Sequence, residues 1–418
     1  MEGNDRSIAG FTMLAHGIFH TYELSIPLFI VIWLDVFDVS AAVLGIVVSI
    51  GYGLIGVGAL PSGILADNYG SRRLIVAAVV GMGGGFFLLA LAPNVYTLGV
   101  AIVVWGAAAS IYHPAGLSLI SRGAEERGTV FAYHGVGGNV GTAFGPLLAA
   151  LLLIFLDWRF VIVALAIPAV VVVILGSSIE FDETAATATD GGERIDDESD
   201  GGERTDSGDE DGGFDLQSIV ADSRLLFTTG FALTFVIVML YGTYYRGLLT
   251  FMPDMIANLP QFGTYTVLGQ SAEPSQYVYT GLLMVGILGQ YAGGRVTDHV
   301  KTEYALLSTL VALAVLAVVF LPAASVGVLP FLAVCAVLGF CLYATAPIYQ
   351  VVIAEYAAED VHGLSYGYTY LGMFGVGAGG AALAGTLLTY FSAPVLLATL
   401  GAIALVAAGL VVVVLRAL

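Results

Sequence analysis

A short polar turn between two long apolar runs decides the fold: Gly63-Ile64-Leu65-Ala66-Asp67-Asn68-Tyr69-Gly70-Ser71-Arg72-Arg73. Its first five positions have a counterpart 231 residues later, Gly294-Arg295-Val296-Thr297-Asp298, which also follows an apolar run and precedes a basic residue, Lys301. Self-similarity at this separation indicates a duplicated chain, and polar turns between apolar helices indicate a membrane protein. Duplication also permits a site between two halves that rock against each other.

The composition agrees with a polytopic membrane protein. Apolar residues make up 58% of the 418-residue chain and charged residues 11%, against about 25% charged in a typical soluble domain. Windows of about 20 residues, matched to a hydrocarbon core about 30 Å thick, predict twelve spanning helices. The start of the chain is polar and no cleavable signal peptide is expected. The expected spans are 8–35, 41–66, 73–93, 96–120, 130–156, 158–180, 223–253, 274–296, 302–323, 327–353, 362–390 and 393–416.

The positions of the 13 Lys and Arg residues set the expected topology. With both termini in the cytoplasm, eleven of them fall on the cytoplasmic side, Arg159 lies outside and Arg246 lies within the membrane. Because positive charge gathers on the cytoplasmic side, we expect a multi-pass protein of the cell membrane with both termini cytoplasmic.

An acidic segment separates the two sets of helices. Residues 180–215 hold fifteen Asp or Glu and only two Arg, so they cannot bury enough apolar surface to fold. We therefore expect an N-terminal six-helix bundle (1–180), an acidic disordered cytoplasmic linker (181–222) and a C-terminal six-helix bundle (223–418). A regulatory or cation-binding tail is the alternative interpretation of the same run.

Further landmarks repeat between the halves and resemble a known family. Gly128–Tyr133 aligns with Gly363–Tyr368, and Pro114 aligns with Pro347. Six helices, a linker and six helices resemble the major facilitator superfamily over nearly the whole chain outside the linker. Gly63–Arg73 looks like the superfamily's signature loop, G-x-L-A-D-x-x-G-x-R-R. The resemblance implies an all-α membrane protein with twelve transmembrane helices in two six-helix halves, and transport by alternating access.

Motifs in helices 4 and 5 point to a subgroup. Gly141-Thr142-Ala143-Phe144-Gly145-Pro146 resembles the core of the helix 5 motif of antiporters, although Leu147–Ala150 stands where that motif has two glycines. Tyr112-His113-Pro114 together with Gly137-Gly138-Asn139-Val140-Gly141 resembles facilitators of the fosmidomycin-resistance type. Many proton-coupled exporters carry an arginine in helix 4, but Thr97–Ser110 has none. The single Lys and the concentrated acid resemble proteins of halophilic archaea.

The signature loop is the expected gate. Asp67 ends one helix while Arg72 and Arg73 begin the next, so a carboxylate and two guanidiniums meet at the membrane surface, where ion pairs can lock one conformation and release another. A plain positive-inside loop with a capping Asp is the alternative. The expected gating residues are Gly63, Asp67, Gly70, Arg72, Arg73 and Asp298.

Ionisable residues inside helix 1 mark a candidate pathway. His16, His20 and Glu23 are spaced to lie on one helix face. Such groups are costly at membrane depth and usually face a cavity or a proton or substrate path, and a His beside a Glu suits proton transfer. Fastening of neighbouring helices by imidazole hydrogen bonds is the alternative. A zinc site is a weaker one, because no further acidic or Cys ligand lies nearby in sequence.

Helices 4 and 5 add three polar candidates. His113 precedes Pro114, His134 lies near the glycine-rich run, and Asn139 lies within it. Each can contact substrate or simply fasten helices. The glycines of helices 5 and 11 are expected to form close, mobile contacts where the two halves meet.

Arg246 lies midway along helix 7, so its charge is expected at membrane depth. An unpaired Arg there costs several kcal/mol. We expect it to meet a carboxylate such as Glu23 of the opposite half, or an anionic ligand. Snorkelling of its side chain to the nearer interface is the alternative.

These features favour a secondary transporter that exports a small organic compound or drug in exchange for protons. Uptake of an organic anion by symport and a non-transporting membrane sensor remain alternatives. An enzyme is not expected, because no nucleophile–base pair is recognisable. The expected partners are a small-molecule substrate, protons and the lipid bilayer; we expect a monomer, no nucleic acid, no cofactor and no metal.

Overall fold

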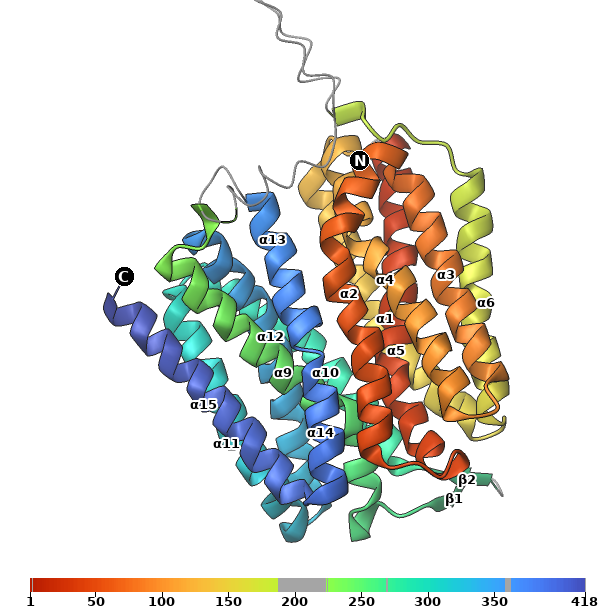
Figure 1. Ribbon diagram of the computed structural model, residues 1–418, viewed down its shortest axis with the longest axis vertical. Helices are drawn as coiled ribbons and strands as arrows, with labels where there is room; N and C mark the ends of the chain where they lie inside the picture. The colour runs from red at the N-terminus through yellow and green to blue at the C-terminus, as the bar shows by residue number, and fades with distance from the viewer. Residues whose placement is uncertain (2, 187–222, 224, 268–269, 358–361, 418) are drawn as a thin grey trace, which may run out of the picture.

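The computed structural model describes residues 1, 3–186, 223, 225–267, 270–357 and 362–417. These residues form two groups of long helices that lie side by side (Figure 1). Most of the expected linker, residues 187–222, falls outside the described residues.

The first group is the N-terminal half. Its helices follow one another with short connections, which keeps consecutive helices antiparallel. A single residue, Gly70, joins α2 to α3, and its φ of +84° is a conformation that a residue with a Cβ adopts only with strain. The helices are α1 (Gly3–Val36), α2 (Ala41–Tyr69), α3 (Ser71–Leu91), α4 (Val95–Gly123), α5 (Arg127–Leu153) and α6 (Trp158–Ser178).

The second group is the C-terminal half. A 3₁₀ turn, η1 (Pro260–Phe262), and a small antiparallel hairpin of β1 (Tyr265–Val267) and β2 (Gln270–Ala272) interrupt it after its first helix. The sequence did not predict this hairpin. The helical segments are α9 (Thr229–Ala257), α10 (Pro274–Thr297), α11 (Thr302–Val326), α12 (Val328–Tyr356), α13 (His362–Tyr370), the π-helical turn η3 (Leu371–Val376), α14 (Gly379–Tyr390) and α15 (Ala393–Ala417).

The expected fold class is confirmed, with twelve helical passes among the described residues. Eleven of them are long and apolar enough to cross a membrane. The twelfth, α10, has 24 residues and is therefore long enough to span, but it is more polar because it carries Gln276, Gln290 and Arg295. The seventh span is shifted: it covers 229–257 rather than 223–253.

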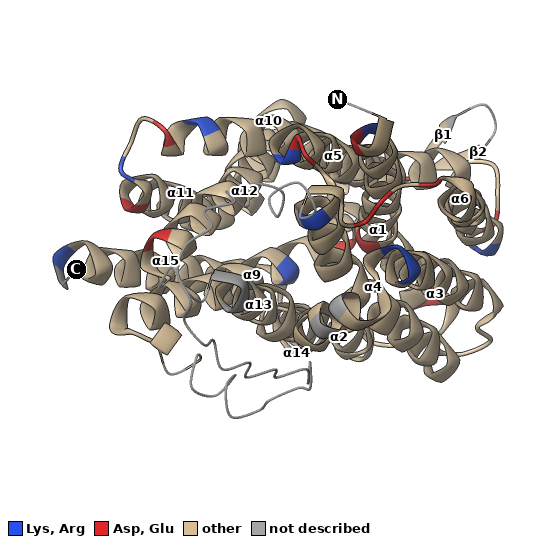
Figure 2. Cartoon of the chain, turned by 90° about the horizontal axis from the view of Figure 1, so that it is seen from above, with Lys and Arg blue, Asp and Glu red and all other residues tan. Residues whose placement is uncertain are grey.

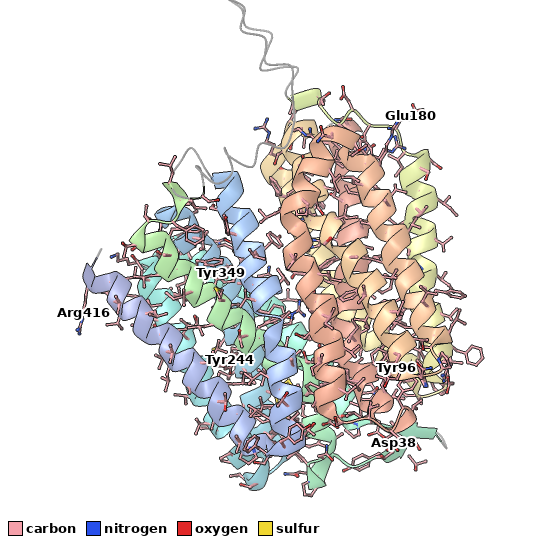
Figure 3. All side chains as sticks on the ribbon, in the orientation of Figure 1. Asp38, Tyr96, Glu180, Tyr244, Tyr349 and Arg416 are labelled. Atoms are coloured by element: carbon pink, nitrogen blue, oxygen red, sulfur yellow. The ribbon has the colours of Figure 1, made fainter. Side chains whose placement is uncertain are left out.

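The loops alternate between two ends of the bundle. We call the end at which α1 begins and α15 ends the terminal end, and the other end the opposite end. Glu180 and Arg416 lie at the terminal end, whereas Asp38 and Tyr96 lie at the opposite end (Figure 3).

The halves pack directly against each other at the opposite end, where α2 meets α14. A Cβ on Gly45 of α2 or on Gly385 of α14 would run into backbone atoms of the facing helix. The hydroxyl of Thr389 accepts the N–H of Ala42 at 2.8 Å, and the Ser49 hydroxyl donates to a backbone carbonyl of the facing segment at 2.8 Å. This end of the interface is closed by backbone contact.

The expected placement of the glycines at the joint between the halves holds for Gly375 and Gly385 of the eleventh pass, which meet α2. It is wrong for Gly372, Gly377 and Gly380, which pack on α9 of the same half, and for helix 5. Gly141 and Gly145 of α5 face α1 of the same half: a Cβ on Gly141 would overlap Gly17, and one on Gly145 would lie 2.7 Å from Thr21. Small residues here let α5 approach α1 closely, rather than forming the joint between the halves.

The eleventh pass was expected to be one continuous helix. It consists instead of α13, η3 and α14 in sequence. The interruption lies where Gly377 passes Gly242 of α9, so close that a Cβ on Gly377 would lie 2.8 Å from the Gly242 backbone. A wider π turn next to such a crossing is a common site of local bending.

Candidate substrate and proton site

A cavity of about 620 Å³ lies between the halves. Its wall includes Ser121 and Phe131, which lie within a few residues of the terminal ends of α4 and α5, so the cavity reaches the terminal end. Seen from above, α1 and α5 of one half and α9 and α12 of the other surround the middle of the molecule (Figure 2). At the opposite end the halves are joined on one flank by the contact of α2 with α14, and on the other by the Tyr277 hydroxyl of α10, which donates to the Ala150 carbonyl of α5 at 3.2 Å.

A buried ion pair joins the two halves beside this cavity. A guanidinium nitrogen of Arg246 on α9 donates to Oε1 of Glu23 on α1, and the two side chains are 2% and 1% exposed. The predicted contact between these residues is therefore present. The Arg246 guanidinium also lies 4.0 Å from the centre of the Tyr52 ring, whose hydroxyl donates to the Glu23 carbonyl at 3.0 Å. Pairing and ring contact together compensate the buried charge.

Arg246 does not itself line the cavity. Among the described residues of the wall, Glu23 is the only Asp, Glu, Lys or Arg. The guanidinium lies behind that carboxylate. An anion in the cavity would therefore meet Glu23 before it met Arg246.

A hydrogen-bonded chain extends from Glu23 along α1. Oε2 of Glu23 lies 2.7 Å from Nδ1 of His20, and Nε2 of His20 lies 3.0 Å from Nε2 of His16. Nδ1 of His16 lies 2.8 Å from the backbone carbonyl oxygen of His134 on α5. The helix 1 residues predicted from spacing thus form one continuous chain.

Two further histidines pack against this chain. The His134 ring stacks on His16 with centroids 3.8 Å apart, and the His113 ring of α4 meets His16 edge-on at 5.1 Å. One ligand atom from each of His16, His20 and His113 lies within 4.8 Å of the others, a spacing at which imidazoles can hold a metal ion. The sequence did not foresee this cluster, because α4 brings in His113 through tertiary packing alone.

The remaining helix 5 residues have two different positions. Asn139 lines the cavity, as expected of a residue that contacts substrate. Gly141, Gly145 and Pro146 lie in the buried face of α5, where the two glycines abut α1. They hold the histidine chain of α1 against α5.

The signature loop is anchored to the end of α6. The Arg72 side chain donates to the carbonyl oxygens of Gly176 and Ser177, each at 3.0 Å, and its backbone N–H donates to the Glu183 carboxylate at 3.2 Å. The last carbonyls of a helix lack partners within the helix and carry partial negative charge, so a guanidinium stabilises them. Arg72 thus joins the α2–α3 turn to the C-terminal end of α6, the last helix of the N-terminal half.

The other predicted gating residues are more loosely placed. Gly63 lies in α2, the Arg73 side chain is exposed, and Asp298 is exposed at the end of α10. The side chain of Asp67 falls outside what the structure describes, and so does its expected pairing with Arg72 and Arg73.

Just beyond α6, Asp182 binds the N-terminal segment of the chain. Its backbone N–H donates to the Asn4 side chain at 2.8 Å, and the Asn4 amide donates to the carbonyl of Gly123 at 2.9 Å. The Thr184 N–H and hydroxyl hold the pKa of the Asp182 carboxyl below its ordinary value. These contacts tie the terminal end of the N-terminal half into one body.

Sequence reasoning missed several residues of the site. Tyr52 faces Arg246, and Gln290, Thr142 and Phe374 line the cavity. Tyr52 lies between two glycines in an otherwise apolar run, which is a weak signal. The hydroxyls of Tyr245 and Tyr343 lie 3.1 Å apart in the same wall.

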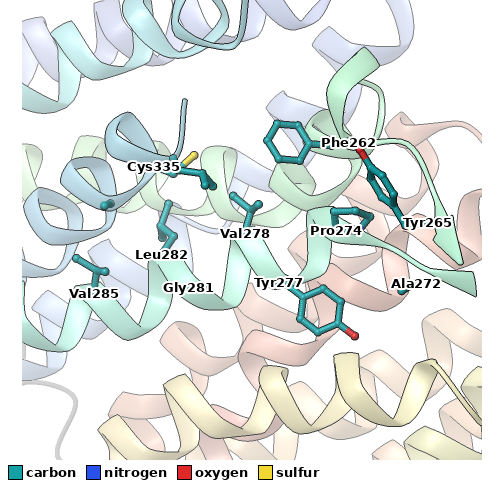
Figure 4. A pocket seen from close by; sticks show the side chains of 12 residues that line it. Phe262, Tyr265, Ala272, Pro274, Tyr277, Val278, Gly281, Leu282, Val285 and Cys335 are labelled. Carbon is teal, nitrogen blue, oxygen red and sulfur yellow. The ribbon is translucent and has the colours of Figure 1, made fainter. Parts of the chain in front are cut away.

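A second cavity, of about 630 Å³, lies between α10, α12 and the hairpin (Figure 4). It is almost entirely apolar. None of its described lining residues is an Asp, Glu, Lys, Arg or His. It offers space but no charge or proton chemistry, so the central cavity is the candidate site.

The sequence pattern of the Major Facilitator Superfamily matches residues 11–379, most of the chain. The chain belongs to the Major Facilitator Superfamily. It is a multi-pass membrane protein, and its central cavity lies between its two halves.

Solved structures of transporters share this arrangement at low sequence identity. A bacterial homologue of the human lysosomal transporter Spinster, in an inward-facing and occupied conformation, superposes with a TM-score of 0.71 at 13% identity, over 100% of this chain and 98% of that one. A nucleoside transporter superposes with a TM-score of 0.74 at 11% identity, over 99% and 100%. These similarities establish the fold.

Sequence identity to three curated proteins is higher but confined to short stretches. A puromycin resistance protein of Streptomyces alboniger is 36% identical over 104 residues, 24% of this chain and 21% of that protein. A Na⁺, Li⁺, K⁺/H⁺ antiporter of Planococcus maritimus is 33% identical over 126 residues, 28% and 29% of the two chains. A multidrug resistance protein B homologue of Mycobacterium tuberculosis is 31% identical over 102 residues, 24% and 19%. The matched stretches span less than a third of each relative.

Proposed function

We propose that this chain is a secondary active transporter of the cell membrane that exports a small organic compound in exchange for protons. The observation that carries the proposal is the buried Glu23–Arg246 pair, which crosses between the halves beside a cavity that is open at one end and closed at the other. A charge pair that crosses a rocking interface can couple ion binding to the exchange of conformations.

In this proposal each group of the cavity has a part. With both termini in the cytoplasm, the structure is an inward-open state. The cavity volume lies within the range of about 300–1,000 Å³ that suits drug-sized ligands. Asn139 and the aromatic wall contact the compound, while the chain from His16 through His20 to Glu23, with His113 and His134 beside it, carries the proton.

The relatives support this direction of transport by their names. Two are called drug resistance proteins and one a cation–proton antiporter. The helix 5 motif from Gly141 to Pro146 favours the same exchange. In this proposal the signature loop, through Asp67, Arg72 and Arg73, sets the rate at which the halves change conformation, with Asp298 as its counterpart in the other half.

Arg246 favours a second candidate, the uptake of an organic anion by symport. An anion that binds Arg246 would displace Glu23, and the displaced carboxylate would then take up a proton, so anion and proton would move together. In the first candidate, by contrast, the compound and the proton compete for the cavity, so they move in opposite directions. The direction of the proton therefore separates the two candidates.

Purified protein in liposomes tests the proposal, with puromycin, a cation at neutral pH, and fosmidomycin, an anionic phosphonate, as probes. A liposome lumen held acidic should accumulate puromycin and lose protons, as a pH-sensitive dye in the lumen reports. Glu23→Gln should abolish this coupling, whereas Glu125→Gln, at an exposed position, should not. Movement of probe and protons in the same direction, or accumulation of neither probe, would contradict the proposal.

A further inference from the structure

The facing imidazoles of His16 and His20 take part in more hydrogen bonds than two neutral rings can supply with protons. Three contacts run along this pair, at 2.8, 3.0 and 2.7 Å. Each falls within hydrogen-bond range and each needs one proton. Two neutral imidazoles bring only two N–H protons between them.

The two outer contacts fix where those protons lie. The partner of His16 Nδ1 is a backbone carbonyl oxygen, which can only accept, so His16 Nδ1 carries a hydrogen. The partner of His20 Nδ1 is the Glu23 carboxylate, which Arg246 holds ionised on its other oxygen, so His20 Nδ1 also carries a hydrogen. In neutral rings both Nε2 atoms would then present bare lone pairs to each other at 3.0 Å.

We infer that one additional proton lies between Nε2 of His16 and Nε2 of His20, and that it is the transported proton. This inference rests on the proposed function and locates its proton. The pair is then an imidazolium–imidazole hydrogen bond with one net positive charge, and Glu23 directly beside it is a counter-charge that the pair shares with Arg246. On release the proton passes from His20 Nε2 to a cavity water, which leaves both rings neutral.

The surroundings favour this place over the carboxylate itself. Both oxygens of Glu23 already accept hydrogen bonds, and its side chain is 1% exposed, whereas that of His20 is 20% exposed toward the cavity. A proton on Glu23 would break the pair with Arg246. His20 can therefore exchange a proton with water while the ion pair between the halves stays intact.

The side chains of other helices that pack on the His16–His20 pair are rings without a formal charge. His113 and Tyr112 of α4 and the stacked His134 of α5 contact His16, and Tyr370 of α13 lies behind His113. In their neutral forms these two imidazoles and two phenols bring no formal charge next to the pair. Glu23, with Arg246 of α9 behind it, supplies the formal charge that faces the pair.

The 3.0 Å separation also distinguishes a proton from a metal ion. Two imidazole nitrogens bound to one zinc at about 2.0–2.1 Å in a tetrahedron lie farther apart than an N–H···N bond requires. A bound metal is nevertheless the one other cation that would satisfy both lone pairs, so the experiment distinguishes the two.

Solid-state NMR of the full-length protein in lipid bilayers, with ¹⁵N-labelled histidine, tests the inference directly. A scalar coupling between the Nε2 atoms of His16 and His20 across the shared proton is expected at mildly acidic pH and should disappear on alkalinisation. His16→Gln should remove it, and His299→Gln, a matched substitution at an exposed position outside the cavity, should leave it. Uncoupled signals at every pH, or a stoichiometric metal ion whose chelation changes them, would overturn the inference.

A transport measurement gives a second readout. The number of protons moved per puromycin should fall at least tenfold in His16→Gln and stay at the wild-type value in His299→Gln. An unchanged ratio in His16→Gln would also overturn the inference. The NMR experiment needs no substrate, so it decides the place of the proton even if wild-type protein moves no puromycin, a result that would overturn the proposed function alone.

Discussion

The interface between the halves is built differently at its two ends. At the opposite end, α2 and α14 touch through glycines, so backbone meets backbone and no space remains. Toward the terminal end the same interface widens into a cavity whose wall carries hydroxyls, amides, four histidines and one carboxylate. Small residues line the closed end, and the ionisable residues line the cavity that reaches the other end.

Closure and polar contact are therefore made by different residues at different places along this interface. The closed end is held by close glycine contacts and by neutral hydrogen bonds of Thr389 and Ser49, and none of these contacts involves a charged group. The polar site depends on one strong contact between the halves, Glu23 with Arg246. Changes at the closed end should therefore alter which conformation is populated, and changes at the polar site should alter what is coupled to it.

The largest effect is expected from adding a side chain at the closed end. Gly385→Val places atoms where the Ala41 carbonyl lies, so the halves cannot close there and transport should fall at least tenfold. Proteoliposome uptake of puromycin measures this. Gly379→Val is the matched control in the same helix, because a Cβ there meets nothing within 4 Å. Wild-type transport by Gly385→Val would show that the glycine contact does not gate.

The next effect concerns the ion pair. Glu23→Gln leaves Arg246 buried without a counter-charge, which costs about 3–5 kcal/mol, so the thermal unfolding midpoint should drop clearly. Adding Arg246→Gln to the same protein should recover much of that stability without recovering proton coupling. Equal stability of wild-type and Glu23→Gln protein in a thermal melt would contradict the buried pair.

A smaller effect is expected from the hydrogen bonds across the closed end. Thr389→Val and Ser49→Ala each remove one bond between the halves, worth about 0.5–1.5 kcal/mol. The population open at this end should then rise by roughly two- to tenfold. Spin-label distance distributions across this end would measure that population. No change in either variant would place the closing energy elsewhere.

The smallest effect separates the two copies of the duplicated loop. Arg72 anchors its turn to the end of α6, whereas Arg295 is exposed and lies over the Tyr291 ring. Arg72→Gln should slow transport a few-fold, and Arg295→Gln should leave it unchanged. Equal slowing in both would mean that the loops act alike, and no slowing in either would remove Arg72 from the gate.

The parts of the fold and site that follow from the sequence are those with a local signal. Apolar runs locate the helices, and helical spacing aligns His16, His20 and Glu23 on one face. The cost of a buried charge was enough to predict that Arg246 needs a carboxylate such as Glu23, because few other acids lie within the membrane.

The remaining features depend on which helices meet, and no local pattern states that. His113 and His134 reach His16 only because α4 and α5 pack on α1. The glycines of α5 could pack against a neighbouring helix or against the other half. We expected the other half, but they pack against α1. The π turn at Leu371–Val376 likewise lies beside the close crossing of Gly377 with Gly242, which no local pattern predicts.

The most direct test of alternating access follows both ends of the interface in one experiment. Spin labels at exposed Val43 and Tyr390 report the opposite end, and labels at exposed Tyr69 and Tyr304 report the terminal end. With puromycin and a lowered pH, we expect the first distance to grow in a fraction of molecules and the second to shrink in the same fraction. Distances that stay fixed, or that grow together at both ends, would contradict alternating access.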